Sequence, residues 1–146
     1  MTTVVYESRS KIMASDSSCF IGSTHILSMR KVWRVGGGLV GCAGDVADIM
    51  RFVRWIRDGA DEDDYPEMES LEAIVVNPDG VARAYENGHS QGMLIRDPYC
   101  AIGSGRDVAL GAMFAGAGAK TAVQAAIRHT GQSKNPVRVF RLKGAE

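Results

Sequence analysis

Tight turns between short β-rich runs limit the folds open to this chain more than any other feature. Residues 25–35 and 39–42 are rich in β-forming side chains, and residues 36–38 between them are all glycine. A glycine turn of this length joins two antiparallel strands. Antiparallel pairing about this turn joins residues whose numbers sum to about 73, which places Lys31 opposite Cys42.

A second hairpin is predicted at the start of the chain. Residues 4–6 and 11–14 are β-rich, and the short polar segment between them indicates a turn centred near Arg9. Pairing about Arg9 joins residues whose numbers sum to about 18. On this register Asp16 lies opposite Thr2, which puts a carboxylate beside the first residues of the chain.

Further hairpins and three helices complete the predicted order of elements. β-rich runs predict the remaining strands over residues 71–76, 81–85, 99–102 and 137–142. Apolar residues at helical spacing, and runs rich in Ala and Gly, predict helices over residues 45–57, 106–115 and 119–128. The acidic segment 58–69 contains Gly59 and Pro66 and is predicted to be a solvated loop. Because hairpins dominate, we expect one α+β domain over residues 1–146, with a layered αββα architecture and no doubly wound parallel sheet.

Charge and cysteine usage exclude several classes of function. The chain has 17 Lys and Arg against 17 Asp and Glu, so no net positive field draws it to nucleic acid or to an anionic membrane. No apolar run is long enough to span a bilayer, and the first residues lack the pattern of a signal peptide. Cys19, Cys42 and Cys100 form no CxxC pair, so neither a zinc site nor a disulfide framework is predicted, and a cytoplasmic protein is expected.

Several short motifs occur in a fixed order along the chain. They are Thr2-Thr3 after Met1, Ala14-Ser15-Asp16, Arg30-Lys31-Val32, the run GCAGDVAD over residues 41–48, and Ala101-Ile102-Gly103-Ser104-Gly105. Each is weak alone, but in this order and spacing they resemble proteasome β-subunits, and most closely the bacterial HslV peptidase, which also begins with two threonines. The resemblance covers nearly the whole chain. It implies a four-layer αββα Ntn-hydrolase sandwich that acts as a threonine-type endopeptidase and needs no cofactor.

The resemblance implies an active site whose nucleophile is Thr2 once Met1 has been removed. A threonine hydroxyl needs a base, and the α-amine of the same residue, with an unperturbed pKa of about 7.7–8.0, suits that task. Lys31 is implied to stabilise the alkoxide, Asp16 to hold Lys31, and the Gly44 N–H at a helix start to bind the oxyanion. The residues implied to complete the network around the amine are Ser104 and Ser133.

The same resemblance implies a substrate, a pocket and partners. The substrate is a peptide or an unfolded protein, and the side chain before the cut is expected to be medium-sized and apolar or neutral. The residues implied to line its pocket are Trp33, Cys42 and Val46. The implied assembly is a ring-shaped homo-oligomer, with an ATP-dependent unfoldase as a further partner.

The chain departs from the family pattern in two places. Thr130 stands where the family usually has an aspartate, three residues before Ser133. Residues 58–70 are acidic and broken by proline where the family has a second long helix, so we expect the fold to be shortened after its first helix. The alternative is therefore a catalytically inactive ring or scaffold protein of the same fold, which retention of Met1 would favour.

Three other patterns in the sequence are not predicted to carry chemistry. Gly36, Gly38 and Gly41 match a dinucleotide fingerprint, but that motif needs a helix that begins within the glycines, and here residues 39–42 predict a strand. The three histidines show no spacing typical of metal ligands. Ser104 lacks the outer glycines of a nucleophile elbow, so it is not predicted to be a nucleophile.

Overall fold

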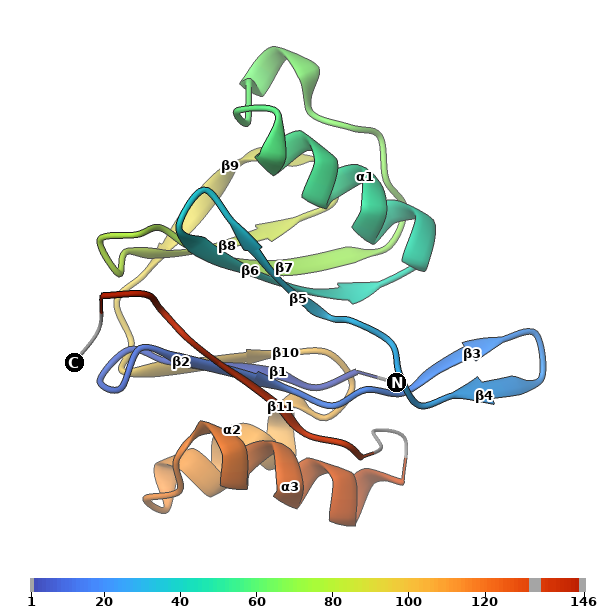
Figure 1. Cartoon of the computed structure of the whole chain (residues 1–146), viewed down its shortest axis with the longest axis vertical. Helices are drawn as coiled ribbons and strands as arrows, with labels where there is room; N and C mark the ends of the chain where they lie inside the picture. Colours follow the sequence, from blue (N-terminus) through green and yellow to red (C-terminus); the bar gives the residue numbers. More distant parts are fainter. Residues whose placement is uncertain (1, 132–134, 145–146) are drawn as a thin grey trace.

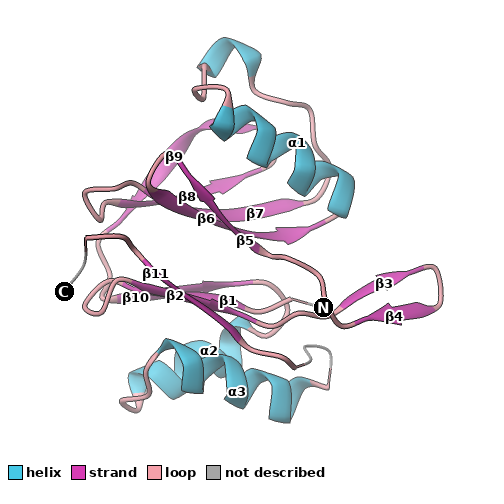
Figure 2. Cartoon of the chain, in the orientation of Figure 1, coloured by secondary structure: helices cyan, strands magenta, loops and turns pink. Residues whose placement is uncertain are grey.

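Two stacked β-sheets with helices on their outer faces make up the computed structural model, which describes residues 2–131 and 135–144 (Figure 1). The larger sheet has the strand order β5 (Val32–Val35), β6 (Gly38–Gly44), β7 (Leu71–Val76), β8 (Ala82–Glu86) and β9 (His89–Ile95). The smaller sheet has the order β10 (Tyr99–Ile102), β1 (Val4–Glu7), β2 (Ile12–Ser15) and β11 (Arg138–Arg141). The larger sheet is covered by α1 (Val46–Arg57), and the smaller one by α2 (Arg106–Phe114) and α3 (Ala119–Thr130) (Figure 2). The predicted αββα layering of an α+β chain is confirmed.

Alternation of side chains along the strands builds three apolar layers. On β1, Val4 and Tyr6 point between the two sheets, whereas Val5 points toward α2 and α3. On β6, Leu39 faces the layer between the sheets. The layer between the larger sheet and α1 contains Phe52, which is fully buried. These layers fix the two sheets face to face.

The hairpin with the glycine turn has the predicted register. Val32 on β5 lies opposite Gly41 on β6, so the paired residue numbers sum to 73. One pair further along, the Cys42 N–H donates to the Lys31 carbonyl at 2.9 Å. The prediction that Lys31 lies opposite Cys42 is confirmed.

The first hairpin is shifted by one residue from the prediction. Its turn ends at Lys11, whose φ of 55° is left-handed, and this lengthens the turn so that its centre falls after Arg9. Asp16 therefore lies opposite Thr3, and its N–H donates to the Thr3 carbonyl at 3.2 Å. The predicted pairing of Asp16 with Thr2 is wrong, although Asp16 still lies beside the first strand.

The predicted single strand over residues 25–35 is also wrong. Here β3 (Cys19–Ile21) and β4 (Thr24–Ile26) pair as a separate two-stranded hairpin that projects from the body of the molecule (Figure 1). In the segment between β4 and β5, the Met29 N–H donates to the Ser17 carbonyl at 3.1 Å. This long-range contact interrupts the β-rich run, and local propensity does not reveal it.

Strand β9 lies outside the strands predicted from the sequence. Its residues are polar at the start and include Gly92, which weakens the strand signal. A Cβ on Gly92 would lie 2.6 Å from the ring of Tyr85 on β8, so the glycine makes room for this aromatic ring. Pairing with β8 therefore determines this strand.

The segment between α1 and β7 contains no second long helix, as expected. It holds one 3₁₀ turn, η1 (Glu62–Asp64). Tyr65 follows this turn, packs edge-on against Phe52 and Trp55, and donates its hydroxyl to the Glu86 carbonyl at 2.8 Å. The fold is thus shortened after α1, and the shorter segment is anchored to the sheet.

Among the described residues, no helix has the length and apolar content needed to cross a bilayer.

Candidate active site

Several segments that are distant in the sequence meet at one end of the two sheets. They are the first residues of the chain, the ends of β2 and β6, the start of β5 and the loop after β10. They surround a cavity of about 400 Å³. Its wall includes Thr2, Lys31, Gly44 and Ser104, which are four of the residues predicted to carry the chemistry. A fifth, Asp16, is buried against Lys31.

A buried ion pair lies at the cavity wall. Lys31 Nζ lies 2.9 Å from Asp16 Oδ1 and 3.1 Å from Oδ2, and the two side chains are 3% and 0% exposed. The Asp16 carboxylate also accepts the Thr3 N–H at 2.9 Å and the Ser18 N–H and hydroxyl at 3.1 and 3.0 Å. Burial lowers the pKa of Lys31, and the charge of Asp16 acts in the opposite direction. Backbone contacts therefore fix the carboxylate, which in turn fixes the ammonium group.

The loop after β10 approaches the backbone of Thr2 closely. The Thr2 nitrogen donates to Ser104 Oγ at 3.2 Å, and the Gly105 N–H donates to the Thr2 carbonyl at 3.2 Å. Gly103 has a φ of 90°, and a Cβ there would lie 2.1 Å from the Thr2 carbonyl oxygen. Glycine permits both this conformation and this approach. The Gly-Ser-Gly motif thus holds the Thr2 nitrogen against a serine hydroxyl.

Gly44 ends strand β6 beside the same cavity. The Cys42 N–H donates to the Lys31 carbonyl, and strand alternation directs the Gly44 N–H toward the same edge of β6. Helix α1 begins just after Asp45, whose side chain accepts the Ala47 N–H at 2.9 Å. An N–H at a helix start, on the side of a buried cation, is suited to stabilise a developing negative charge.

Of the three residues predicted to line a substrate pocket, Val46 lies on the cavity wall. Trp33 and Cys42 lie elsewhere: they are 7% and 0% exposed and pack in the core under α1. Their positions on β5 and β6 direct them to that face of the sheet. The apolar side chains that line the cavity with Val46 are Phe20, Met29, Ala43 and Ile49. Helical spacing from Val46 could have identified Ile49, but Phe20 and Met29 come from a segment with no periodic pattern.

The remaining predictions concern the end of α3 and metal ligands. Ser133 lies outside the described residues. Thr130 is the last residue of α3, and its hydroxyl donates to the Ala126 carbonyl at 2.7 Å within the final helical turn. In the part of the chain that the structure describes, no group of three or more His, Cys, Asp and Glu side chains is placed to hold a metal ion.

Comparison with known proteins bears on the fold. No family model matches the sequence, and no curated protein matches it. Among solved structures, the chain is similar to BPH of Thiobacillus denitrificans in complex with epoxomicin, with a TM-score of 0.70 and 20% identity over 98% of this chain and 100% of that one. A second structure of Thiobacillus denitrificans BPH has a TM-score of 0.63 and 22% identity over 98% of each chain. Eukaryotic HslV from Trypanosoma brucei has a TM-score of 0.69 and 19% identity over 94% of this chain and 97% of that one.

Proposed function

Because the chain shares the HslV-like Ntn-hydrolase fold, we propose that it is a threonine-type endopeptidase whose nucleophile is Thr2. The observation that carries this proposal is the convergence of Thr2, the Lys31–Asp16 ion pair, Gly44 and Ser104 at one cavity. Acyl transfer uses a hydroxyl nucleophile, a base and an N–H donor for the oxyanion, and a fixed cation favours the developing alkoxide. The proposed substrate is an amide bond in a peptide or an unfolded protein.

The reaction begins after removal of Met1 has freed the α-amine of Thr2. The amine takes the hydroxyl proton as Thr2 Oγ attacks the scissile carbonyl, and Lys31 stabilises the negative charge that develops on the attacking oxygen. The Gly44 N–H donates to the carbonyl oxygen as it becomes an oxyanion. Collapse of the tetrahedral intermediate breaks the C–N bond, passes the proton to the leaving amine and leaves the acyl group on Thr2. Water then attacks the ester with the same amine as base, which releases the acid and restores Thr2.

Two residues act in this proposal by holding the reacting groups. Asp16 keeps the Lys31 ammonium group at the cavity wall through contacts of 2.9 and 3.1 Å. The cation disfavours protonation of the nearby Thr2 amine, which must be neutral to act as a base. Ser104 Oγ accepts from the Thr2 nitrogen at 3.2 Å and so orients the amine.

The proposal extends to ligand and assembly. Thiobacillus denitrificans BPH is in complex with epoxomicin, so we propose the Thr2 cavity as the site where the same compound would bind this chain. The resemblance to HslV supports a homo-oligomeric ring in the cytoplasm that receives unfolded chains from an ATP-dependent unfoldase. The test is peptide turnover by the parent protein with and without epoxomicin. Unchanged turnover would count against this cavity as the binding site of the compound.

Substitution of Thr2 tests the proposed nucleophile. We expect Thr2→Ala to reduce turnover of a fluorogenic peptide to background without loss of fold, whereas Thr2→Ser keeps partial activity because a hydroxyl and an amine remain. The matched control is Thr24→Ala, an exposed threonine on β4, which should retain parent turnover. Activity of Thr2→Ala within a few-fold of the parent would rule out this nucleophile.

A catalytically inactive ring or scaffold protein of the same fold is the second candidate. The observation in its favour is Thr130 at the position of the family's aspartate, with its hydroxyl bonded to the Ala126 carbonyl at 2.7 Å. The intact mass of natively expressed protein separates the two candidates. A chain that starts at Thr2 supports the peptidase, and retention of Met1 throughout the preparation supports the scaffold.

A further inference from the structure

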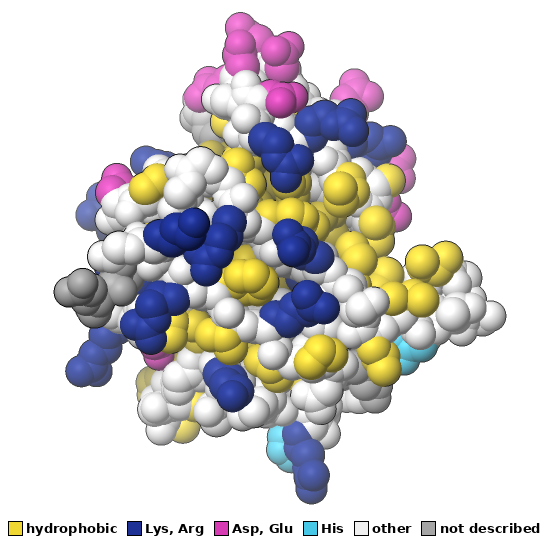
Figure 3. All heavy atoms as spheres, viewed as in Figure 1, with side chains coloured by type: hydrophobic (Ala, Val, Ile, Leu, Met, Phe, Trp, Pro, Cys, Tyr) yellow, Lys and Arg dark blue, Asp and Glu magenta, His cyan; other side chains and the backbone are white. Residues whose placement is uncertain are grey.

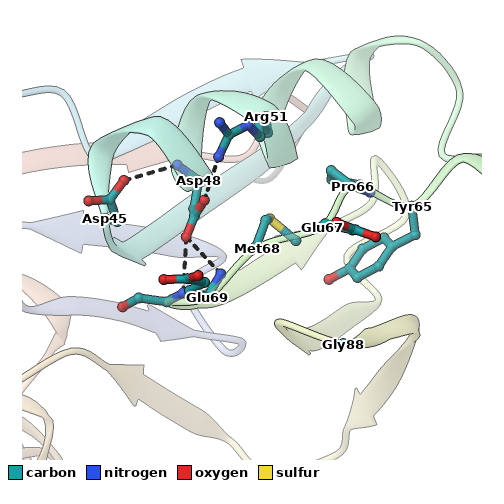
Figure 4. A pocket seen from close by; sticks show the side chains of 10 residues that line it. Asp45, Asp48, Arg51, Tyr65, Pro66, Glu67, Met68, Glu69 and Gly88 are labelled. Carbon is teal, nitrogen blue, oxygen red and sulfur yellow. Dashed lines mark hydrogen bonds and ion pairs between the residues drawn. The ribbon is translucent and has the colours of Figure 1, made fainter.

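Asp48 is a buried carboxylate in the first turn of α1 that lines a groove next to the catalytic cavity and is not among the residues of the cavity wall (Figure 4). Its Oδ2 atom accepts the Glu69 N–H and the Ser70 N–H, both at 3.0 Å. Its Oδ1 atom accepts from Arg51 at 2.8 Å. Figure 4 shows Asp48 directed from α1 toward the segment that ends at Glu69. Asp48 therefore joins α1 to the two residues that precede β7.

The segment held by Asp48 forms the support for Gly44. The Ser70 carbonyl accepts the Asp45 N–H at 3.0 Å, and Gly44 pairs with Leu71 at the end of the β6–β7 ladder. A Cβ on Gly44 would lie 2.2 Å from the same Ser70 carbonyl oxygen, so the two backbones are in close contact. Both Asp45 and Ser70 line the groove of about 1100 Å³ beside Asp48 and also the catalytic cavity. Ser70 thus connects the Asp48 contacts to the Gly44 peptide.

We propose that Asp48 is a positioning residue that sets the direction of the Gly44 N–H, an inference that rests on the proposed peptidase function. Gly44 has a φ of 128° and no side chain to anchor it, so its peptide is oriented by its neighbours. Asp48 fixes Ser70 from one side, and Ser70 fixes Asp45 and limits Gly44 from the other. An oxyanion donor must be held within a fraction of an ångström of its productive position to contribute fully.

The two backbone bonds, and not the ion pair, carry this role. Arg51 is 56% exposed, and a partly solvated ion pair contributes little. The Glu69 and Ser70 N–H groups both donate to a side chain that is 8% exposed, through two partly buried hydrogen bonds, so removal of the carboxylate would take away the protein acceptor of both donors. These two N–H groups are also the main reason that the pKa of Asp48 lies below its ordinary value, which keeps the carboxylate ionised as an acceptor.

Two reactions of Thr2 separate the role of Gly44 from that of the nucleophile. Hydrolysis of a fluorogenic peptide passes through an oxyanion and needs the Gly44 N–H. In alkylation by a peptide vinyl sulfone, Thr2 Oγ1 bonds to the β-carbon, the π bond breaks, and the amine passes the hydroxyl proton to the carbon beside the sulfone. This reaction uses the nucleophile and its base without a carbonyl oxyanion. Hydrolysis is followed as kcat and KM, and alkylation is followed by intact mass, on assembled protein that begins at Thr2.

We expect Asp48→Ala to lower kcat for hydrolysis by about tenfold to 10²-fold, with KM and the alkylation rate within about threefold of the parent. Asp48→Asn keeps an oxygen acceptor for both N–H groups and should restore most of kcat. Arg51→Ala is the matched control and should leave both reactions within about threefold. If Asp48→Ala does not fold, Asp48→Glu, which displaces the carboxylate by one methylene, should show the same selective loss to a smaller extent.

Three outcomes would overturn the role of Asp48 alone. The first is that kcat of Asp48→Ala equals that of an active parent. The second is that Asp48→Ala lowers the rates of hydrolysis and alkylation equally. The third is that Arg51→Ala lowers kcat as much as Asp48→Ala does. A parent protein that neither hydrolyses the peptide nor is alkylated at Thr2 would overturn the proposed function, and this inference with it.

Discussion

Lys31 and Asp16 are oppositely charged side chains with almost no contact with water. Transfer of two ions from water into a protein interior costs several kcal/mol for each ion, and their attraction offsets that cost only when the geometry is good. Packed apolar residues of similar volume would stabilise the fold at least as well. The pair is therefore explained better by the catalytic role proposed for Lys31 than by stability.

Substitution of Lys31 tests this explanation. Lys31→Met keeps most of the stem and removes the charge, so we expect peptide turnover to fall by about 10²–10³-fold. Lys31→Arg should not restore it, because a planar guanidinium is larger than an ammonium group. The measurement is fluorogenic peptide turnover by assembled protein, and the exposed Lys120, changed to Met, is the control.

Lys31→Met also removes the counter-ion of the buried Asp16 carboxylate, which costs about 3–5 kcal/mol of stability. The double variant Lys31→Met with Asp16→Asn removes both charges. Because both carboxylate oxygens of Asp16 accept N–H groups and asparagine has one oxygen, we expect the double variant to recover only part of the thermal midpoint and none of the turnover. Parent turnover in either variant would contradict a catalytic role for the cation.

Among single residues, a position set by a local turn was predicted better than contacts that depend on irregular or left-handed backbone. The Lys31 register followed from a glycine turn whose geometry is local, and the structure confirms it. The partner of Asp16 was predicted one residue away from its position, because the left-handed conformation of Lys11 has no strong sequence signal. The contact of Ser18 with Asp16 was not predicted, since it depends on the path of an irregular segment.

The loop that leads into α2 offers a test at the scale of elements. A Cβ on Gly105 would lie 1.9 Å from Thr3 Oγ1, so we expect Gly105→Ala to displace the loop, destabilise the protein and lower turnover. Gly111 lies within α2, and a Cβ there meets nothing within 4 Å. Gly111→Ala should instead raise stability by about 0.5–1 kcal/mol. Thermal denaturation of both variants checks this, and equal midpoints would argue against the close approach of the loop to Thr3.

The elements that were predicted correctly are those whose ends carry strong local signals, such as turn glycines and helix-capping side chains. Helix α1 agrees with the predicted helix over residues 45–57 to within one residue, and the Asp45 side chain caps it by accepting the Ala47 N–H. Strand β9 and the β3–β4 hairpin were not predicted, because pairing between distant segments determines them. The layered αββα architecture could still be predicted, since it depends on the order of hairpins and helices and not on each boundary.

At the scale of the whole molecule, charge and apolar surface are unevenly distributed despite a formal net charge of zero. Figure 3 shows Lys and Arg across the viewed face, acidic side chains gathered at the top, and hydrophobic side chains near the projecting hairpin. On that hairpin Phe20 is 48% exposed and Ile21 is 68% exposed. A two-stranded hairpin is marginally stable alone, and exposed apolar surface of this kind favours association.

We therefore expect a closed homo-oligomer in solution, as the resemblance to HslV implies. Contacts between unlike surfaces of identical chains form rings when the rotation between neighbours closes. Sedimentation velocity at micromolar concentration should give a mass that is a multiple of 15.7 kDa. A single species near 15.7 kDa would contradict the ring.

The central claim, that Thr2 is a terminal nucleophile which carries the acyl group, is tested most directly by mass spectrometry. The protein is mixed with a peptide ester, quenched in acid within the first turnover, and mapped by proteolysis. We expect a chain that starts at Thr2, a mass increase equal to one acyl group located on Thr2, and no such increase in Thr2→Ala. An acyl group on any other residue, or peptide hydrolysis by protein that still carries Met1, would contradict it.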